Sequence, residues 1–171
     1  MTAALQTLSF KGRVWTVGDN IDTDIILPGR FLYATDRQAL RQALFEGLDP
    51  TLAAKLRDGD IFVAGRNFGC GSARPAAAAM RAAGVSCVVA QSFSRTFLRG
   101  AIDSGVPILE CDIAGCIVNG DVIQVDIAAA TVSLADGRVF LGNPYPSFVL
   151  DVLRIGGILP YTRQQLAANI A

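Results

Sequence analysis

The chain has no histidine among its 171 residues. A protein without imidazole cannot use a Ser-His-Asp or Cys-His catalytic arrangement, and it cannot pass protons through histidine. Any proton transfer carried out by this chain must therefore use serine, aspartate, glutamate, tyrosine, lysine or cysteine.

Cysteine is scarce as well, and the four that occur do not have the spacing of a metal site. Cys87 and Cys111 lie in or beside apolar runs, so we expect both to be small core residues. Cys111 and Cys116 are a poor match to the common zinc signatures, which a histidine would usually complete. We therefore expect this chain to hold no metal and no cofactor of its own.

Neither sign of charge dominates, and no long apolar run is present. Lys+Arg and Asp+Glu number 15 each, which argues against a nucleic-acid partner or a polybasic membrane site. No apolar run approaches the roughly 18 residues of a membrane-spanning helix, and the N-terminus lacks the pattern of a secretion signal. We expect a cytoplasmic protein that forms a single domain over residues 1–171.

The most informative stretch runs from Ile61 to Pro75. An apolar strand leads into a loop with three glycines, and a run of alanines follows Pro75, where proline suits the first helical position. The loop therefore presents Ser72 and Arg74 at a helix N-terminus, where free N–H groups and the helix dipole favour an anion such as a carboxylate. The alternative is that Ser72 only caps the helix and that Arg74 is solvated.

The pattern around this stretch predicts an α/β protein with a parallel βαβαβ core. The expected core elements are strands 61–64, 85–90 and 106–110 and helices 76–83 and 95–103. Ligands of such sheets bind beyond the carboxyl ends of the strands, where the loops 65–74 and 91–94 must lie. Ser94 and Arg95 could join the site there, although a capping serine and a surface arginine explain them equally well.

The flanking segments complete the expected fold. The last third alternates apolar and polar residues around an Asp-Gly turn, which predicts an antiparallel β appendage. The remaining expected elements are a loose lead-in over 1–9, a strand over 12–17, helices over 36–46, 50–56 and 146–155, and a frayed tail over 160–171.

Two segments near the N-terminus have more than one interpretation. Asp19, Asp22 and Asp24 could coordinate a hard cation, but the offsets of a calcium loop are missing. A turn rich in Asx hydrogen bonds explains most of these aspartates, with one of them open to a role in a site. The apolar segment 31–34 either packs in the core or lines a pocket.

Several short motifs occur in order along the chain. They are Gly12-Arg13-Val14-Trp15, Asp19-Asn20-Ile21-Asp22-Thr23-Asp24, Ile26-Leu27-Pro28, Asn67-Phe68-Gly69-Cys70-Gly71-Ser72 with Arg74, Ser92-Phe93-Ser94-Arg95, Ala101-Ile102 with Gly105-Val106-Pro107, and Gly156-Gly157-Ile158-Leu159-Pro160-Tyr161. With these motifs the chain resembles the isopropylmalate dehydratase small subunits of the aconitase family over nearly its whole length.

The resemblance implies a swivelling β/β/α domain that closes over a large subunit, as a heterodimer or heterotetramer. In this family the large subunit holds a [4Fe–4S] cluster, and the two subunits exchange 2-isopropylmalate and 3-isopropylmalate by removing and re-adding water, a step of leucine biosynthesis. By resemblance, Ser72 stands at the position of the catalytic base, Asp24 at that of an active-site aspartate, and Arg74 at that of the substrate-carboxylate arginine.

The glycine loop departs from the usual family motif Gly-Ser-Ser-Arg-Glu-His. Here Ala73 replaces the second serine and Pro75 replaces the glutamate, and the histidine is absent. Ala73 retains its backbone N–H but loses the hydroxyl, while Pro75 removes one N–H from the helix start. By resemblance, Gly71 and Ala73 contact the substrate together with Arg74.

A second departure concerns the segment that tunes substrate choice in this family. Relatives that handle an extra carboxylate resemble Tyr-Leu-Arg, whereas this chain has Phe31, Leu32 and Tyr33. The resemblance therefore implies an apolar or small substituent on the substrate. Two alternatives stay open: a hydro-lyase subunit for another alkyl-malate or citramalate-like acid, and a non-catalytic binding module on the same scaffold.

Overall fold

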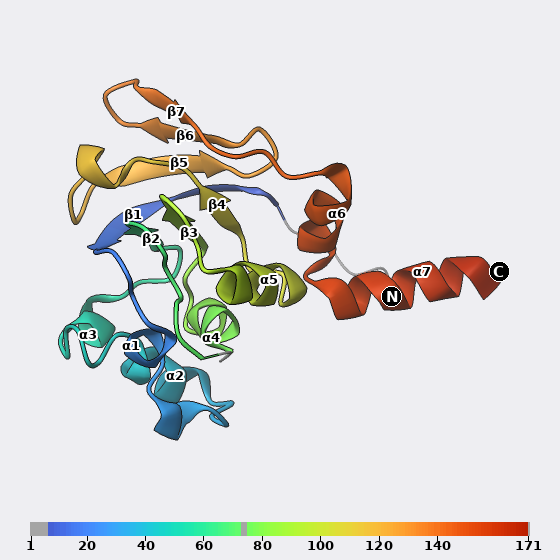
Figure 1. Cartoon of the computed structure of the whole chain (residues 1–171), viewed down its shortest axis with the longest axis horizontal. Coiled ribbons are helices and arrows are strands. Elements are labelled where there is room, and N and C mark those ends of the chain that lie inside the picture. Colours follow the sequence, from blue (N-terminus) through green and yellow to red (C-terminus); the bar gives the residue numbers. More distant parts are fainter. Residues whose placement is uncertain (1–6, 73–74, 171) are drawn as a thin grey trace.

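The computed structural model describes residues 7–72 and 75–170, which form a seven-stranded sheet in the order β4-β3-β2-β1-β5-β6-β7 (Figure 1). Four strands run parallel: β1 (Ser9–Val17), β2 (Ile61–Ala64), β3 (Cys87–Ala90) and β4 (Ile108–Glu110). The antiparallel strands are β5 (Val122–Asp126), β6 (Thr131–Leu134) and β7 (Val139–Leu141). The predicted parallel core and antiparallel appendage are both confirmed.

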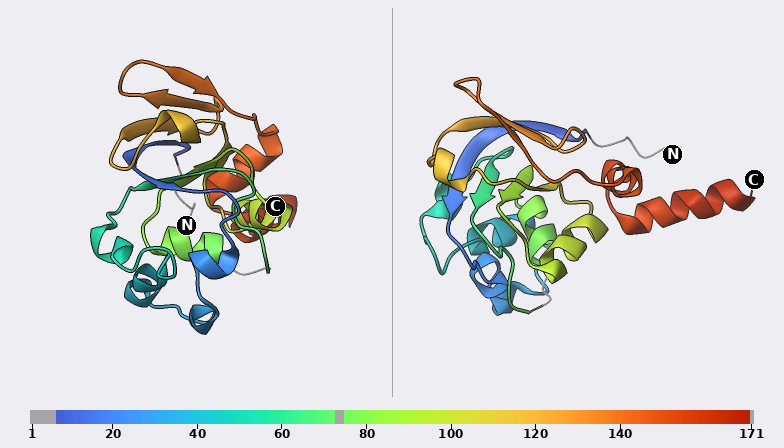
Figure 2. Two further views of the ribbon diagram at one scale, coloured as in Figure 1. Left: turned by 60° about the vertical axis from the view of Figure 1, so that its left-hand side comes forward. Right: turned by 45° about the horizontal axis from the view of Figure 1, so that its top comes forward.

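β1 joins the two parts of the sheet because its two halves have different partners. Residues 14–17 pair in parallel with β2, whereas residues 9–13 pair antiparallel with β5. Figure 2 shows β1 curving along its length, with the antiparallel strands folded over one face of the parallel ones. The expectation of a loose lead-in through residue 9 was wrong by this short margin, because β5 supplies a partner from a distant part of the chain.

Helices cover the other face of the parallel strands (Figure 1). They are α1 (Thr23–Ile26), η1 (Gly29–Phe31), α2 (Arg37–Ala43), α3 (Leu52–Lys55), α4 (Ala76–Ala82) and α5 (Arg95–Asp103). On the side of the antiparallel strands lie η2 (Ala114–Cys116), beside β5, and α6 (Ser147–Ile155), and α7 (Ile158–Ile170) extends the C-terminal end. Within the described part of the chain, no helix combines the length and apolar character needed to cross a membrane.

The central strands are buried on both faces, so their side chains divide between two apolar clusters. Phe62 and Val88 point into the cluster under α2, α4 and α5, whereas Val63 and Val89 point into the cluster under the antiparallel strands and α6. Parallel strands that are covered on both faces have continuous apolar runs in their sequence, and these runs made the strands predictable. Cys87 and Cys111 are buried, as predicted.

α2 ends earlier than the sequence indicated, at Ala43 rather than Glu46. Phe45 adopts a left-handed backbone conformation (φ 55°), and its N–H donates to the carbonyl of Ile26. The ring of Phe45 is fully buried and stacks on Phe62 at a centroid distance of 4.7 Å. Burial of this ring, worth about 2 kcal/mol or more, outweighs the helical preference of the last residues.

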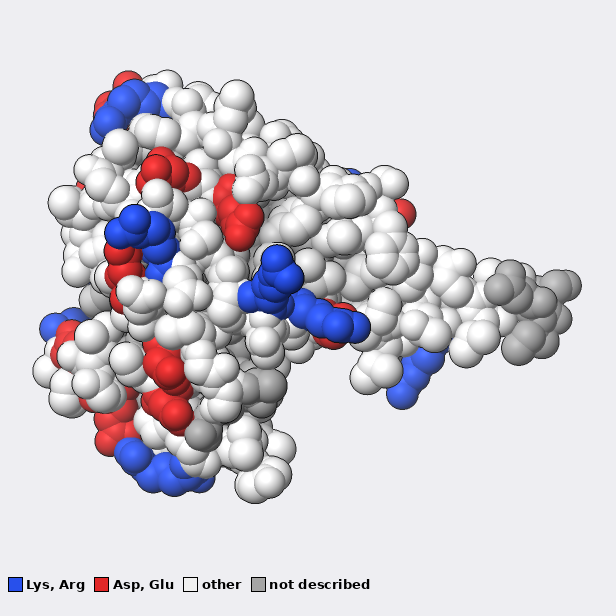
Figure 3. All heavy atoms as spheres, in the orientation of Figure 1, with Lys and Arg blue, Asp and Glu red and all other residues white. Residues whose placement is uncertain are grey.

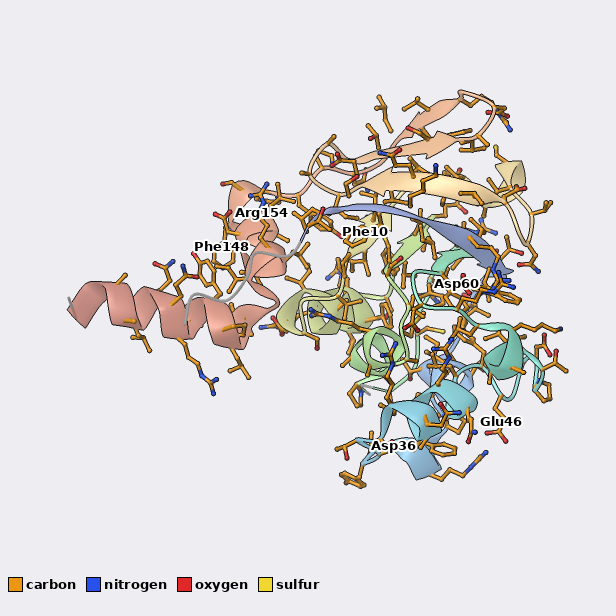
Figure 4. All side chains as sticks on the ribbon, turned by 180° about the vertical axis from the view of Figure 1, so that it is seen from behind. Phe10, Asp36, Glu46, Asp60, Phe148 and Arg154 are labelled. Atoms are coloured by element: carbon orange, nitrogen blue, oxygen red, sulfur yellow. The ribbon has the colours of Figure 1, made fainter. Side chains whose placement is uncertain are left out.

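The C-terminal segment is a helix, so the predicted frayed tail was wrong. α7 projects away from the sheet (Figure 1), and its first turn is held by an edge-to-face contact between Phe148 and Tyr161 at 5.4 Å. Figure 4 places Phe148 on α6, beside the start of α7. Pro160 lies in the first turn of α7, where no intrahelical partner is needed for its missing N–H, so it does not prevent the helix.

A buried aspartate ties β1 to the amino end of β2. Asp60 is 2% exposed and accepts hydrogen bonds from the Arg13 guanidinium (2.7 Å), the Trp15 indole (2.7 Å) and the backbone N–H of Arg57 (2.8 Å). Burial raises the pKa of this carboxyl, but the hydrogen bonds from Arg13, Arg57 and Trp15 outweigh burial, and the net pKa lies below the ordinary value. Asp60 directly precedes β2, whereas the loops described next follow the carboxyl ends of the strands.

Candidate functional site

Three loops meet at the carboxyl ends of β1, β2 and β3. The loop after β2 lies between the other two and forms short parallel bridges to both, between Phe68 and Phe93 and between Asp22 and Cys70. The N–H of Phe68 donates to the carbonyl of Ser92 at 3.0 Å, and the N–H of Gly69 donates to the carbonyl of Ile21 at 2.8 Å. The predicted meeting of the loops after β2 and β3 is therefore confirmed for their described residues, and the loop after β1 joins them there.

An aromatic cluster supports the central loop from below. Phe68 packs edge-to-face against Phe97 at 5.1 Å and against Phe93 at 6.1 Å. Gly69 lies directly on this cluster with φ 76°, and a Cβ atom there would stand 2.2 Å from Phe97. Only glycine fits both the left-handed backbone and the contact with the ring, so this glycine shapes the loop.

Gly71 makes the corresponding close approach to the loop after β1. Its φ is 93°, and a Cβ atom would stand 2.3 Å from a carboxylate oxygen of Asp22. Asp22 also caps α1, because its side chain accepts from the N–H of Asp24 at 2.7 Å. Gly71 therefore fixes the position of α1, which carries Asp24, against the loop that carries Ser72.

Thr23 connects these two segments directly. Its N–H donates to the carbonyl of Cys70 at 2.8 Å, and its hydroxyl donates to the carbonyl of Ser72 at 2.9 Å. Thr23 is 2% exposed, whereas the neighbouring Asp24 and Ser72 are exposed to solvent. The fold thus brings Ser72 and Asp24, two of the predicted site residues, to the same edge of the sheet.

Ser72 lies on the wall of a small cleft between α4 and α5. The residues that line the cleft are Thr23, Ser72, Pro75, Ala77, Ala78, Thr96, Phe97, Gly100 and Ser104. Sequence reasoning missed Thr96 and Ser104, which are hydroxyl-bearing residues that line the same cleft as Ser72. Their signal was the four-residue spacing of Thr96, Gly100 and Ser104, which places small and polar residues along one side of α5.

An apolar groove adjoins the cleft, and the two share Pro75 and Ala78 as walls. The groove is lined by Leu27, Phe31, Leu32, Ala34, Thr35, Leu40, Pro75, Ala78, Ala79 and Ala82. Of the two interpretations of segment 31–34, a loop that lines a pocket is therefore correct. Tyr33 differs from its neighbours, since it is 90% exposed and is not part of the lining.

The capping interpretation of Ser72 is wrong. α4 begins at Ala76, and Pro75 occupies the capping position, one residue before the helical position expected for it. Ala73 and Arg74, both predicted to bind substrate, lie outside the described residues. Ser94 does act as a cap: its hydroxyl accepts from the N–H of Phe97 at 3.2 Å and donates to the carbonyl of Gly69 at 2.6 Å.

Asp22 makes the Asx hydrogen bond that the turn interpretation predicted, to the N–H of Asp24, whereas the partner of Asp19 lies in another loop. Asp19 accepts from the backbone N–H of Arg66 at 2.7 Å and forms an ion pair with its guanidinium at 3.2 Å. These contacts hold the pKa of Asp19 below its ordinary value, the backbone hydrogen bond contributing most. Arg95 is exposed and does not line the cleft, as expected of a surface arginine.

Charges of both signs are interspersed on the face drawn in Figure 3. Within residues 7–72 and 75–170, no three Cys, Asp or Glu side chains are placed to hold a metal ion together. The four cysteines are free and differ in environment: Cys87 and Cys111 are buried, Cys70 is partly buried and Cys116 is exposed.

The chain is similar to aconitase-type proteins in sequence. Residues 51–112, which include the glycine loop, α4, β3 and α5, match the family described as the aconitase C-terminal domain. The chain is 42% identical over 162 residues to the isopropylmalate/citramalate isomerase small subunit of Methanocaldococcus jannaschii, covering 93% of this chain and 96% of that one. It is 44% identical over 155 residues to the 3-isopropylmalate dehydratase small subunit of Halothermothrix orenii, covering 89% and 94%.

The fold is similar as well. The crystal structure of a 3-isopropylmalate dehydratase from Methanocaldococcus jannaschii superposes with a TM-score of 0.88 at 31% identity, covering 95% of this chain and 98% of that one. This similarity confirms the predicted fold class, with its parallel core and antiparallel appendage.

Proposed function

Because this chain belongs to the isopropylmalate dehydratase small-subunit family, we propose that it is the small subunit of a hydro-lyase that interconverts 2-isopropylmalate and 3-isopropylmalate in leucine biosynthesis. The observation that supports this function is the pairing of two surfaces at the carboxyl ends of the strands. A hydroxyl-lined cleft, suited to a polar hydroxy-diacid, shares a wall with an apolar groove, suited to its alkyl group.

Ser72 is the proposed catalytic base, which takes the proton from the carbon next to a carboxylate. A serine hydroxyl is a weak base in water, so it needs a fixed positive environment to act in this way. In the sequence Arg74 stands two residues away and would supply such an environment while binding the substrate carboxylate. Asp24, which the Thr23 contacts place at the same edge, is proposed as the second catalytic residue.

The partner is an iron–sulfur large subunit, in a cytoplasmic heterodimer or heterotetramer. The [4Fe–4S] cluster of that subunit would supply a Lewis acid for the leaving hydroxyl. This chain contributes the proton-transfer groups and the walls that orient the diacid. Both contributions need the exposed edge that carries Ser72 and Asp24 to face the large subunit.

The apolar groove is better suited to bind an alkyl substituent of the substrate than a third carboxylate. Its described lining is apolar except for Thr35 and contains no cationic side chain. A carboxylate buried there would lack a partner and would cost several kcal/mol, on the order of the penalty for an unpaired buried charge. Phe31 and Leu32 instead offer contacts to an isopropyl group, or to the methyl group of a smaller acid.

The test is the activity of the Ser72→Ala variant in the assembled enzyme. The chain is expressed with its large subunit, the cluster is reconstituted anaerobically, and the absorbance of the unsaturated acid is followed. Loss of the proton-transfer group predicts a fall in kcat on the order of 10³-fold. The matched control is Ser147→Ala, which removes an exposed serine from the start of α6. A Ser72→Ala rate equal to that of the control would remove Ser72 as the base.

A further inference from the structure

The contacts of Thr23 make it more than a buried loop residue. The loop after β1 and the loop after β2 run in parallel here, and backbone hydrogen bonds join Gly69 to Ile21 and Thr23 to Cys70. At Gly71 the backbone turns to φ 93°, and the chain leaves the extended direction. The carbonyl of Ser72 then accepts a hydrogen bond from the side-chain hydroxyl of Thr23, at 2.9 Å, so the two loops are joined here by a side chain and not by a further backbone N–H.

We infer that Thr23 is a positioning residue, whose hydroxyl holds the Ser72 backbone so that the Ser72 side chain stays on the wall of the cleft. The inference rests on the proposed function, in which Ser72 is the base. Thr23 is 2% exposed, and its N–H and hydroxyl bind carbonyls on both sides of Gly71, the flexible point of the loop. A shift of the reacting oxygen by about 1 Å lowers a rate by up to about 10²-fold, so this restraint matters for the chemistry.

The same contact has little weight in the stability of the fold. Ser72 is exposed, so water can satisfy its carbonyl when the Thr23 hydroxyl is removed. A Thr23→Val substitution keeps the shape of the side chain and removes only the donor. Thr23 therefore differs from a residue that merely supports the core: its loss is expected to change kcat far more than the melting temperature or KM.

The experiment compares Thr23→Val and Thr23→Ser in the assembled enzyme with 2-isopropylmalate as substrate. Thr23→Val is expected to lower kcat about 10- to 100-fold with KM changed by less than about threefold. Thr23→Ser retains the hydroxyl and is expected to restore kcat to within about threefold of wild type. The matched control is Thr16→Val on β1, where the hydroxyl also donates to a loop, to Asn119 at 3.0 Å, and where neither residue lines the cleft.

A double variant separates this inference from the proposed function. If Thr23 acts through Ser72, Thr23→Val adds no further loss to Ser72→Ala. Two outcomes would overturn the positioning role and leave Ser72 as the base. In one, the losses of kcat in the two single variants add in the double variant. In the other, Thr23→Val has the kcat of wild type while Ser72→Ala is inactive. An active Ser72→Ala variant would overturn the base assignment instead.

A measurement that does not depend on turnover tests the geometry itself. The amide of residue 23 donates to Cys70, so its hydrogen exchange in the full chain reports whether the two loops stay together. Exchange at this amide is expected to be at least about fivefold faster in Thr23→Val than in wild type or Thr16→Val, and unchanged exchange would contradict the inference. If Thr23→Val does not fold, Thr23→Cys, with its weaker donor, takes its place with the same expected outcomes.

Discussion

The two ends of the parallel strands use polar side chains in opposite ways. At the amino end of β2, Asp60 is buried and accepts hydrogen bonds from two side chains and a backbone N–H. At the carboxyl end, Ser72 and Asp24 are exposed beside the cleft, and the restraint comes from the backbone around them, through Thr23 and two tightly packed glycines. The amino end is built for stability, and the carboxyl end is built to present groups to a ligand.

This difference predicts that substitutions at the two ends separate stability from activity. A buried carboxylate with its hydrogen bonds made cannot be removed without leaving its donors without a partner. A residue that orients an exposed loop can be removed with a modest loss of stability, but the geometry of the cleft changes.

The largest effect is expected for Asp60→Ala. The substitution leaves the Trp15 indole N–H without its acceptor, and it leaves the Arg13 guanidinium with the carbonyl of Lys55 but without its carboxylate partner. Breaking a buried ion pair costs about 3–5 kcal/mol, and because Arg13 is 27% exposed we expect the lower value of about 3 kcal/mol. Urea unfolding measures the loss, while kcat per folded complex is expected to stay near wild type.

Two comparisons check the origin of this loss. Asp58→Ala removes an exposed carboxylate that pairs with Arg37 and Arg41 and is expected to destabilise the chain much less. Because the pKa of Asp60 is lowered on folding, its contribution is present above about pH 4 and is lost as the pH falls through the lowered pKa. The stabilities of wild type and Asp60→Ala should converge in acid, and a constant difference down to about pH 2 would contradict this account.

The next effect is expected for Gly71→Ala at the carboxyl end. A side chain at φ 93° costs about 1–2 kcal/mol, and its Cβ would stand 2.3 Å from the Asp22 carboxylate. Asp22 must move, and it caps the helix that carries Asp24. We expect a stability loss of about 2 kcal/mol and a fall in kcat/KM of about 10²-fold, measured on the assembled enzyme.

Gly120→Ala is the matched control for Gly71→Ala. Gly120 has nearly the same φ, 95°, but a Cβ atom there meets nothing within 4 Å. Gly120→Ala is expected to lose about 1–2 kcal/mol of stability, because of backbone strain alone, and to keep its activity. Equal activity losses in the two variants would show that strain in general, rather than the contact with Asp22, accounts for the effect.

The same contrast explains which parts of the molecule the sequence made predictable. The buried strands and the glycine loop were recognisable because apolar runs, glycines and proline act locally. The role of Thr23 was not, because its hydroxyl meets Ser72 only when segments 49 residues apart in sequence fold together. The early end of α2 likewise depends on the contact of Phe45 with Phe62. The C-terminal helix, expected to be a frayed tail, depends on the contact of Phe148 with Tyr161, which brings two segments of the chain together.

The smallest effect is expected where the cleft meets the apolar groove, at Ala78, which lines both. Ala78→Leu adds three carbon atoms to the shared wall and so narrows the space proposed for the alkyl group. KM for 2-isopropylmalate is expected to rise about tenfold, equivalent to about 1.4 kcal/mol, while KM for citramalate, with only a methyl group, changes less than about threefold. Ala82→Leu, one helical turn away and in the groove only, should have a weaker effect on both acids. If Ala78→Leu raises KM equally for both acids, the groove does not hold the alkyl group. The carboxyl end of the sheet would then differ from the amino end in proton transfer alone.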